Sequence, residues 1–335
     1  MKNSLSYRLR NTKFNYAKNL KYFIIAPICI ALIGIVLLFT IGFNKGIDFT
    51  GGSIINVVLG EQLEQTAYYN ESVEKIEEVL NNNGLKASLY QLSETDNGLA
   101  ISVRYQNING ISEEEMNDIN ANVREELFIT FELDPNASEE ANLIQDSQRI
   151  GATASSELLM NAFISMLVVI VAIFIYIAIR FELTSGLASV LALFHDVIMM
   201  ASLMLIFRIE INSSFIAAMI TIIGYSINNT ILIFDRIREN AKNEIYSKTD
   251  NATIANISIN ETMSRSIFTN LTTLLSIVSV AAIGVPSIRL FALPIIFGLI
   301  AGAYSSVFIA PGLWAIAYRK KNKVKKQPKV TVEEN

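Results

Sequence analysis

The chain has 335 residues, of which 51% are hydrophobic and 17% charged, and its mean hydropathy of +0.39 excludes a purely water-soluble globular protein. Its charge is uneven: residues 44–157 hold 21 acidic and 6 basic side chains, a net of −15, whereas the rest of the chain has a net of +11. The sequence therefore predicts an acidic water-soluble segment within a basic, apolar frame, and nucleic acid is a poor partner for either part.

Six apolar stretches predict membrane-spanning helices, because a bilayer core of about 30 Å needs about 20 apolar residues per helix. The first follows a short N-terminal segment, residues 1–21, and the other five come after the acidic segment. The predicted spans are residues 22–43, 158–179, 184–207, 213–234, 267–285 and 290–318. The predicted fold class is a multi-pass α-helical membrane protein with one extracytoplasmic α+β domain between the first two helices.

The positions of lysine and arginine predict the orientation of these spans. Of the 27 basic residues, 19 fall in the N-terminal segment, at Arg180, in the link between the fourth and fifth spans, or in the tail of residues 319–335. All these places lie on the same side of the membrane if every span crosses it. We therefore expect both termini to be cytoplasmic and residues 44–157 to lie outside.

The acidic segment, residues 44–157, is long enough to fold. Its apolar residues alternate over residues 53–59, which predicts a first strand. Residues 86–92 and 99–105 predict two further strands, joined by a hairpin turn at Thr95-Asp96-Asn97-Gly98. A helix between the first and second strands is indicated by Val73, Ile76, Val79 and Leu80, which recur at helical spacing.

A second amphipathic helix follows the hairpin. Ser112 and Glu115 form a capping box at its start, and Met116, Ile119, Val123 and Leu127 form its apolar face. A last strand near residues 143–148 gives the order βαββαβ, the ferredoxin-like pattern with both helices on one face of a four-stranded sheet.

Two ionisable residues lie near the middle of the third span. Such a side chain costs about 2.5–3.5 kcal/mol at the centre of a membrane helix on insertion scales, which makes it a candidate functional residue. Asp196 ends a stripe of small and polar residues that begins at Ser185. Helix geometry places His195 about 100° away, so we expect the two side chains not to share a partner. The alternative interpretation makes Asp196 a structural hydrogen-bond acceptor.

Polar stripes also mark the fourth and fifth spans. The fourth carries Thr221, Tyr225, Asn228 and Asn229, and the fifth carries Arg265, Thr269, Thr272, Thr273 and Ser276. Such stripes often only join helices, with about 0.6 kcal/mol per hydrogen bond. Three adjacent stripes, two of them with a charge, favour a hydrated path for a proton or cation. Gly298 and Gly302 in the sixth span form a GxxxG pattern that predicts close helix packing.

Several kinds of chemistry are absent from the sequence. A single cysteine, Cys29, and a single histidine exclude an intramolecular disulfide and the common zinc and iron–sulfur ligand sets. No G-x-x-x-x-G-K-[ST] pattern occurs, so we expect no ATP hydrolysis. We expect neither an enzyme nor a cofactor or metal, with H⁺ or Na⁺ as the coupling ion.

Five blocks of residues resemble, in order, the signature of the SecF family of bacterial protein-export subunits, which belongs to the SecD/SecF group of the resistance-nodulation-division superfamily. The resemblance covers nearly the whole chain. The blocks are Gly46-Ile47-Asp48-Phe49-Thr50-Gly51-Gly52, Arg180-Phe181-Glu182 with His195-Asp196-Val197, Gly224 to Thr230, Phe234-Asp235-Arg236-Ile237-Arg238-Glu239-Asn240, and Ser264-Arg265-Ser266 with Thr269 to Thr273. Within the fourth block, Arg236, Arg238 and Glu239 look like an ordered turn just past the span.

The resemblance implies a function and partners. SecF-like chains pair with a SecD-like subunit in the bacterial plasma membrane and assist the SecYEG channel in late export of preproteins, driven by the proton or sodium gradient. YajC is a further partner implied by the resemblance, and membrane lipid surrounds the spans. Arg265 matches the family's basic residue in the fifth span, a charge partner in the path.

One position departs from the family pattern. The fourth-span motif usually reads G-Y-S-x-N-D, with the Asp implicated in proton passage, and here that position is Asn229. An amide cannot titrate, although its oxygen can bind Na⁺. Asp196 or the partner would then carry the essential carboxylate. Two alternatives remain: an uncoupled scaffold or assembly subunit, and a small-molecule exporter of the same superfamily.

Overall fold

The computed structural model describes residues 15–95, 98–108, 110–133, 144–150, 152–246, 249–284 and 286–325. Its residues form two compact units. The membrane unit comprises Met1–Phe43, Ser165–Ile209 and Ser214–Asn335, and the soluble unit comprises Asn44–Ile164 and Glu210–Ser213. The soluble unit thus includes the loop between two membrane helices as well as the acidic segment.

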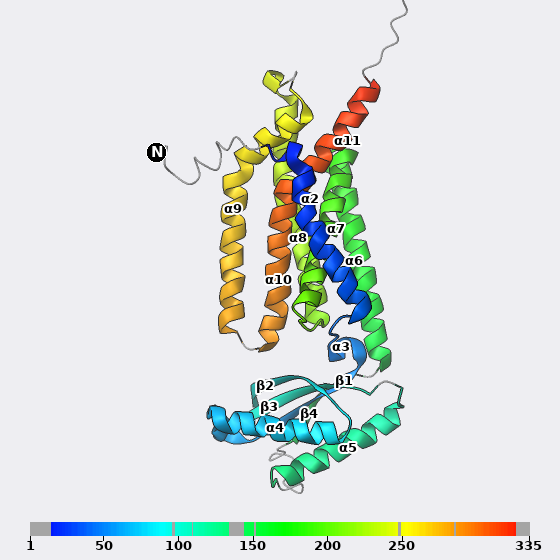
Figure 1. Cartoon of the computed structure of the whole chain (residues 1–335), viewed down its shortest axis with the longest axis vertical. Coiled ribbons are helices and arrows are strands. Elements are labelled where there is room, and N and C mark those ends of the chain that lie inside the picture. Colours follow the sequence, from blue (N-terminus) through cyan, green and yellow to red (C-terminus); the bar gives the residue numbers. More distant parts are fainter. Residues whose placement is uncertain are drawn as a thin grey trace, which may run out of the picture. The chain divides into compact units, whose positions relative to one another are not determined.

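The helices of the membrane unit include six that are long and apolar enough to cross a membrane (Figure 1). They correspond in number and order to the six predicted spans. The helices are η1 (Ala17–Asn19), α2 (Leu20–Thr40), α6 (Ala152–Arg180), α7 (Leu183–Ile206), α8 (Ser213–Lys242), η4 (Glu244–Tyr246), α9 (Asn251–Ile283), α10 (Pro286–Tyr304), the π-helix η5 (Ser305–Ile309) and α11 (Ala310–Lys325). The last three run on from one another and together form the sixth span, Ile288–Tyr318. The first part of α6, up to Ile164, belongs to the soluble unit.

Two helix boundaries differ from the sequence prediction. The turn expected at Arg236, Arg238 and Glu239 is wrong, because α8 stays helical through Lys242. Helix α9 begins at Asn251, well before the predicted start at residue 267. The apolar residues mark only the part of each helix that faces lipid, whereas intrahelical hydrogen bonding continues into polar sequence.

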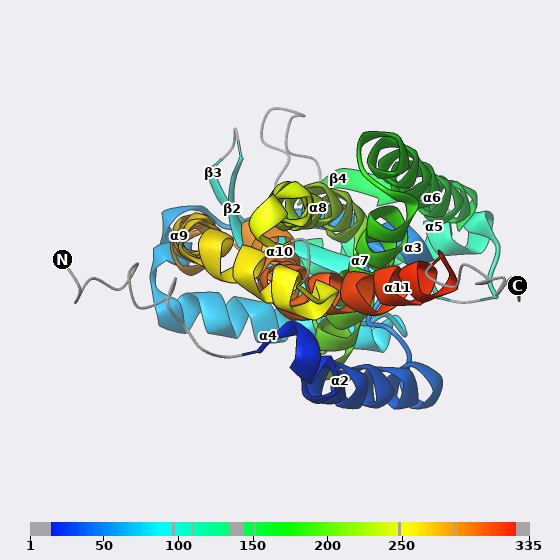
Figure 2. The ribbon, with the colours of Figure 1, turned by 90° about the horizontal axis from the view of Figure 1, so that it is seen from above.

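Helix α7 lies at the centre of the membrane unit, in contact with α2, α10 and α11. Seen from above, α2, α6 and α9 lie on the periphery (Figure 2). Small residues allow close approach: a Cβ at Gly34 of α2 would collide with Ser202 of α7, and a Cβ at Gly298 of α10 would lie 2.6 Å from Ile222 of α8. The predicted close packing of the GxxxG pattern therefore occurs between α10 and α8.

The acidic segment folds into a four-stranded antiparallel sheet with strand order β2-β3-β1-β4. Its elements are α3 (Ile47–Thr50), β1 (Gly52–Val58), η2 (Gly60–Glu64), α4 (Thr66–Asn82), β2 (Ala87–Thr95), β3 (Gly98–Gln106), α5 (Glu113–Thr130) and β4 (Ile144–Ile150). Strands and long helices thus follow one another in the predicted order, and Thr95 pairs with Gly98 at the hairpin.

One hydrophobic core joins the sheet to both α4 and α5. Val57 and Ile101 from the sheet, Ile76 from α4 and Val123 from α5 are almost fully buried in it. The capping box of Ser112 and Glu115 starts α5 as predicted. Both long helices therefore cover the same face of the sheet (Figure 1).

Candidate functional site

A buried carboxylate links the third and fourth membrane helices. Asp196 of α7 is 1% exposed, and its Oδ2 accepts a hydrogen bond of 2.5 Å from the Ser226 hydroxyl of α8. Its Oδ1 lies 2.9 Å from Nδ1 of His195. Both carboxylate oxygens are therefore bonded, in the length range of charge-assisted hydrogen bonds. We call His195, Asp196 and Ser226 the buried cluster.

His195 and Asp196 contact each other instead of pointing apart, but they share no third partner among the described residues, as expected. Successive residues of a helix do leave the axis about 100° apart, but rotation about the side-chain bonds brings the imidazole back to the carboxylate. The His195 ring stacks on Tyr304 with centroids 6.3 Å apart. Its Nε2 is buried and has no hydrogen-bond partner among the described residues. The buried cluster thus ends in a free ring nitrogen.

Glycine lets a third helix close over the buried cluster. A Cβ at Gly302 of α10 would lie 2.9 Å from the Cβ of Ser226, closer than side chains normally approach. Ser185, Ser189 and Ala192, the stripe that leads to Asp196, are buried as well. Small residues on α7 and α10 therefore let the carboxylate and hydroxyl meet away from lipid.

A second set of polar contacts joins α8 to α9. The Tyr225 hydroxyl lies 2.9 Å from Thr273 Oγ1 and donates to the Thr269 carbonyl at 3.3 Å. The Asn229 amide donates to Asn270 Oδ1 at 2.9 Å. Asn229 is buried. Its partner among the described residues is thus the amide of Asn270 and not an ionisable group.

The remaining predicted path residues lie on exposed faces. Asn228, Arg265, Thr269 and Thr272 are exposed, and Arg265 forms no hydrogen bond or ion pair within the part of the chain that the structure describes. The structure does not bring these side chains to the buried cluster. The apolar part of α9 is little buried, which leaves its polar face open, whereas the first half of the helix is buried against the rest of the unit.

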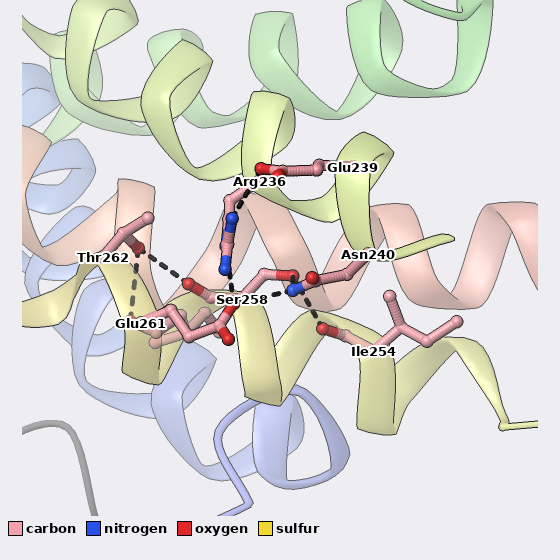
Figure 3. A network of polar contacts seen from close by, with 8 residues as sticks. Arg236, Glu239, Asn240, Ile254, Ser258, Glu261 and Thr262 are labelled. Atoms are coloured by element: carbon pink, nitrogen blue, oxygen red, sulfur yellow. Dashed lines mark hydrogen bonds and ion pairs between the residues drawn. The ribbon is translucent and has the colours of Figure 1, made fainter. Parts of the chain in front are cut away.

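A polar network joins the C-terminal part of α8 to the first half of α9 (Figure 3). Arg236 binds Glu261 of α9 through Nε at 2.6 Å and Glu239 through Nη1 at 2.5 Å. Asn240 donates to both Glu261, at 2.8 Å, and Ser258, at 3.0 Å.

The other two charged residues of this motif lie outside the network. Arg238 instead donates to the carbonyl of Arg180, at the end of α6, at a distance of 3.2 Å. Asp235 is exposed. The charged residues of the Phe234–Asn240 block thus stabilise the contacts of α8 with α9 and with the end of α6.

The Gly46–Gly52 block is held against the loop between α7 and α8. Asp48 Oδ2 accepts a hydrogen bond of 2.7 Å from the Ser213 amide, and the Gly46 amide donates to the Ile211 carbonyl at 2.8 Å. Gly51 has φ of +75°, a conformation that favours glycine. Gly52 has no room for a side chain, because a Cβ would collide with Tyr105 and Ile47.

The residues of these contacts that were not among the predicted site residues include Ser226, Asn270, Glu261 and Ser258. Ser226 lies one helical turn below Thr230 in the fourth span, and Glu261 is an acid at helical spacing from Arg265. Such spacing could have drawn attention to them, but only the packing of α9 on α8 identifies their partners. No group of three metal-ligating side chains occurs among the described residues.

Comparison with protein families gives two matches. The family described as "Protein export membrane protein SecD/SecF, C-terminal" matches residues 133–320, and the "SecD/SecF GG Motif" matches residues 36–59. The second match contains the whole Gly46–Gly52 block and strand β1. The first covers more than half of the chain, including all helices that carry the polar contacts.

Individual proteins match over most of the chain. The Protein translocase subunit SecF of Helicobacter pylori is 35% identical over 303 residues, covering 90% of this chain and 86% of that protein. The Protein translocase subunit SecF of Borreliella burgdorferi is 33% identical over 311 residues, covering 91% of this chain and 98% of that protein. The crystal structure of SecDF, a translocon-associated membrane protein from Thermus thermophilus, matches with a TM-score of 0.69 and 30% identity over 93% of this chain. The present chain spans 39% of that SecDF chain.

Proposed function

The chain belongs to the SecD/SecF family of protein-export membrane proteins, as a SecF-type translocase subunit, and from that premise we propose that it couples ion movement to late export of preproteins. The single observation that carries the coupling is the buried cluster. A carboxylate 1% exposed in a membrane helix is costly to retain without a role. The proposed coupling requires no ATP hydrolysis, and in this proposal the chain is not an enzyme.

The proton is carried by the His195–Asp196–Ser226 chain. Asp196 binds a proton when Ser226 turns its hydroxyl away, and releases it when the serine donates again. His195 exchanges the proton through Nδ1 and presents Nε2 at the end of the chain. Asn229 takes no part in proton transfer, since its amide is bound to Asn270. Na⁺ as the coupling ion would instead use the amide and carboxylate oxygens as ligands.

A SecD-like subunit covers the open faces of α8 and α9. Asn228, Arg265 and Thr272 are exposed there, and an arginine at membrane depth requires a partner. The partner's carboxylate would pair with Arg265. One solved structure that this chain resembles is a SecDF chain, of which this chain spans 39%, and this supports a SecD-like partner. We further propose the SecYEG channel, YajC and the translocating preprotein as partners of the assembled complex.

The soluble unit is proposed to be a ferredoxin-like domain outside the cytoplasm. Its element order and its strand order β2-β3-β1-β4 support the split βαβ topology. The distribution of basic residues supports cytoplasmic termini in a bacterial inner membrane. Movement of this domain on the periplasmic side would pull the emerging preprotein.

Substituting Asp196 tests the coupling. In a pulse-chase experiment with cells depleted of the chromosomal copy, Asp196→Asn should abolish the part of export that an ionophore abolishes in wild type, because an amide cannot carry a proton. Collapsing the proton and sodium gradients separately identifies the ion. Glu244→Gln, which changes an exposed acid of η4 that the proposal does not use, is the matched acid-to-amide control and should retain wild-type kinetics of release. Unchanged export by Asp196→Asn would contradict coupling through this chain.

One observation favours the second candidate, an uncoupled scaffold subunit. Asn229 stands where the family usually has an acid, and it is satisfied by Asn270. In this case export would depend on the presence of the chain but not on Asp196. Normal release of secreted proteins in depleted cells would contradict both candidates and favour export of small molecules.

A further inference from the structure

The loop between α7 and α8, Glu210–Ser213, is held by the residues that precede the first strand. Its backbone pairs with theirs twice, through Gly46 N–H to the Ile211 carbonyl and Ile211 N–H to the Asn44 carbonyl, both at 2.8 Å. The Ser213 N–H donates to Asp48 at 2.7 Å. We call residues 210–213 with residues 44–48 the loop clasp. All of these residues belong to the soluble unit.

A carboxyl group is buried inside the loop clasp. Glu210 is 6% exposed, and its Oε1 has no hydrogen-bond partner among the described residues. A Cβ at Gly46 would collide with this oxygen, so the glycine backbone covers the carboxyl group directly. The first glycine of the family motif is therefore needed to enclose Glu210.

The surroundings of Glu210 disfavour its ionised form. Burial raises the pKa of Glu210, and the nearby negative charge of Asp48 raises it further. Arg104 of β3 and the hydroxyl group of Ser88 of β2 act in the opposite direction and lower this pKa, but burial dominates. These are the charged and hydrogen-bonding groups that face the carboxyl from α3, β2 and β3.

We propose that Glu210 is a positioning residue whose protonation keeps the loop clasp closed and whose ionisation opens it. In the closed clasp the carboxyl holds its proton to higher pH than a glutamate exposed to water. Closure is therefore strongest below the ordinary pKa of glutamate, about 4.3, and weakens as the pH rises from there through the raised value. At a pH between the free and the raised pKa values, opening releases one proton to water.

The loop clasp is covalently continuous with the buried cluster. Helix α7, which carries Asp196, ends at Ile206 four residues before Glu210, and α8, which carries Ser226, begins at Ser213. Under the proposal, a change in the loop reaches the ends of both helices through this covalent connection. Its consequence for export rests on the proposed function, whereas the clasp itself can be tested without export.

Hydrogen exchange of the full-length chain in lipid nanodiscs tests the proposal. The protection of the Gly46 and Ile211 amides, corrected for intrinsic exchange, is measured from about pH 4 to about pH 8. Both amides donate to backbone carbonyls, so no other titrating acceptor affects their hydrogen bonds directly. In wild type, protection should fall about tenfold per pH unit between the free and raised pKa values.

Two variants separate the role of Glu210 from general effects of pH. Glu210→Gln, a neutral isostere, should keep both amides protected over the whole range. Glu64→Gln, on the exposed surface of the soluble unit, should retain the wild-type profile. Protection of the central strand β3 reports that each variant is folded. A flat wild-type profile, or a Glu210→Gln profile equal to that of wild type, would overturn the proposal while leaving the result of the Asp196 experiment unaffected.

Discussion

The two units of the molecule bury different kinds of side chain. In the soluble unit most of the fully buried side chains are apolar, such as Val57 and Ile101, although Ser72 is buried as well. In the membrane unit several fully buried residues are serines, among them Ser189, whereas Ile283 is 88% exposed. Water drives apolar groups inward, but lipid is as apolar as isoleucine and provides no such force. The same chain is thus stabilised by hydrophobic burial in one unit and by close helix packing and hydrogen bonds in the other.

The largest expected effect is in the soluble core. Ile101→Ala removes a side chain that is 0% exposed and should destabilise the soluble unit by about 2–5 kcal/mol, through lost burial and the cavity left behind. The loss is measured as reduced amide protection of β1 and β3 in the full-length chain. Leu187→Ala on α7, where the side chain is 51% exposed, is the control and should change stability by less than about 0.5 kcal/mol. Equal effects would remove the contrast between the units.

A smaller effect is expected from crowding the membrane unit. Gly298→Leu places a side chain against Ile222, where even a Cβ would lie only 2.6 Å away, and overpacking of this kind costs about 1–3 kcal/mol. Thermal denaturation in detergent should show a lower midpoint. The matched control is Gly224→Ala in α8, where a Cβ meets nothing within 4 Å. If Gly298→Leu is as stable as the control, close packing of α10 on α8 does not stabilise the bundle.

The smallest effect is the coupling between Asn229 and Asn270. A double-mutant cycle with both residues changed to alanine should give an interaction energy of about 0.6 kcal/mol, the average for hydrogen bonds between membrane helices. Denaturation of the four proteins in detergent provides the values. A cycle of Asn228 with Asn270 should give no coupling, since Asn228 is exposed and Asn229 makes the contact. Coupling well above about 2 kcal/mol would indicate that polar contacts dominate the membrane unit.

Features that depend on nearby residues were predictable from the sequence. Apolar runs of about 20 residues specify six membrane helices, whatever the tertiary packing of those helices. The capping box of Ser112 and Glu115 and the hairpin at Thr95 and Gly98 form as expected, because both involve residues at most three positions apart. The carboxylate of Asp196 was also identifiable, since an acid in an apolar helix stands out in the sequence alone.

The partners of the site residues were not predictable. Asn270 for Asn229 and Glu261 for Arg236 depend on how α9 is rotated and placed against α8. The contact between His195 and Asp196 depends on side-chain rotamers, which the backbone period does not fix. Arg265 and Thr272 belong to the predicted stripe, but the packing of α9 leaves them exposed and apart from the buried cluster.

The sequence by itself determined the family, the six spans, the soluble insertion and the acid in the third span, because these follow from composition and local spacing. The tertiary structure decided which polar groups are buried and what they bind. Glu210 shows the difference most clearly: in the sequence it is one acid in a short loop, and only the glycine backbone at Gly46 and the strands carrying Ser88 and Arg104 enclose it. Burial is a property of residues distant in the chain, so the chemistry that depends on burial appears only in the folded molecule.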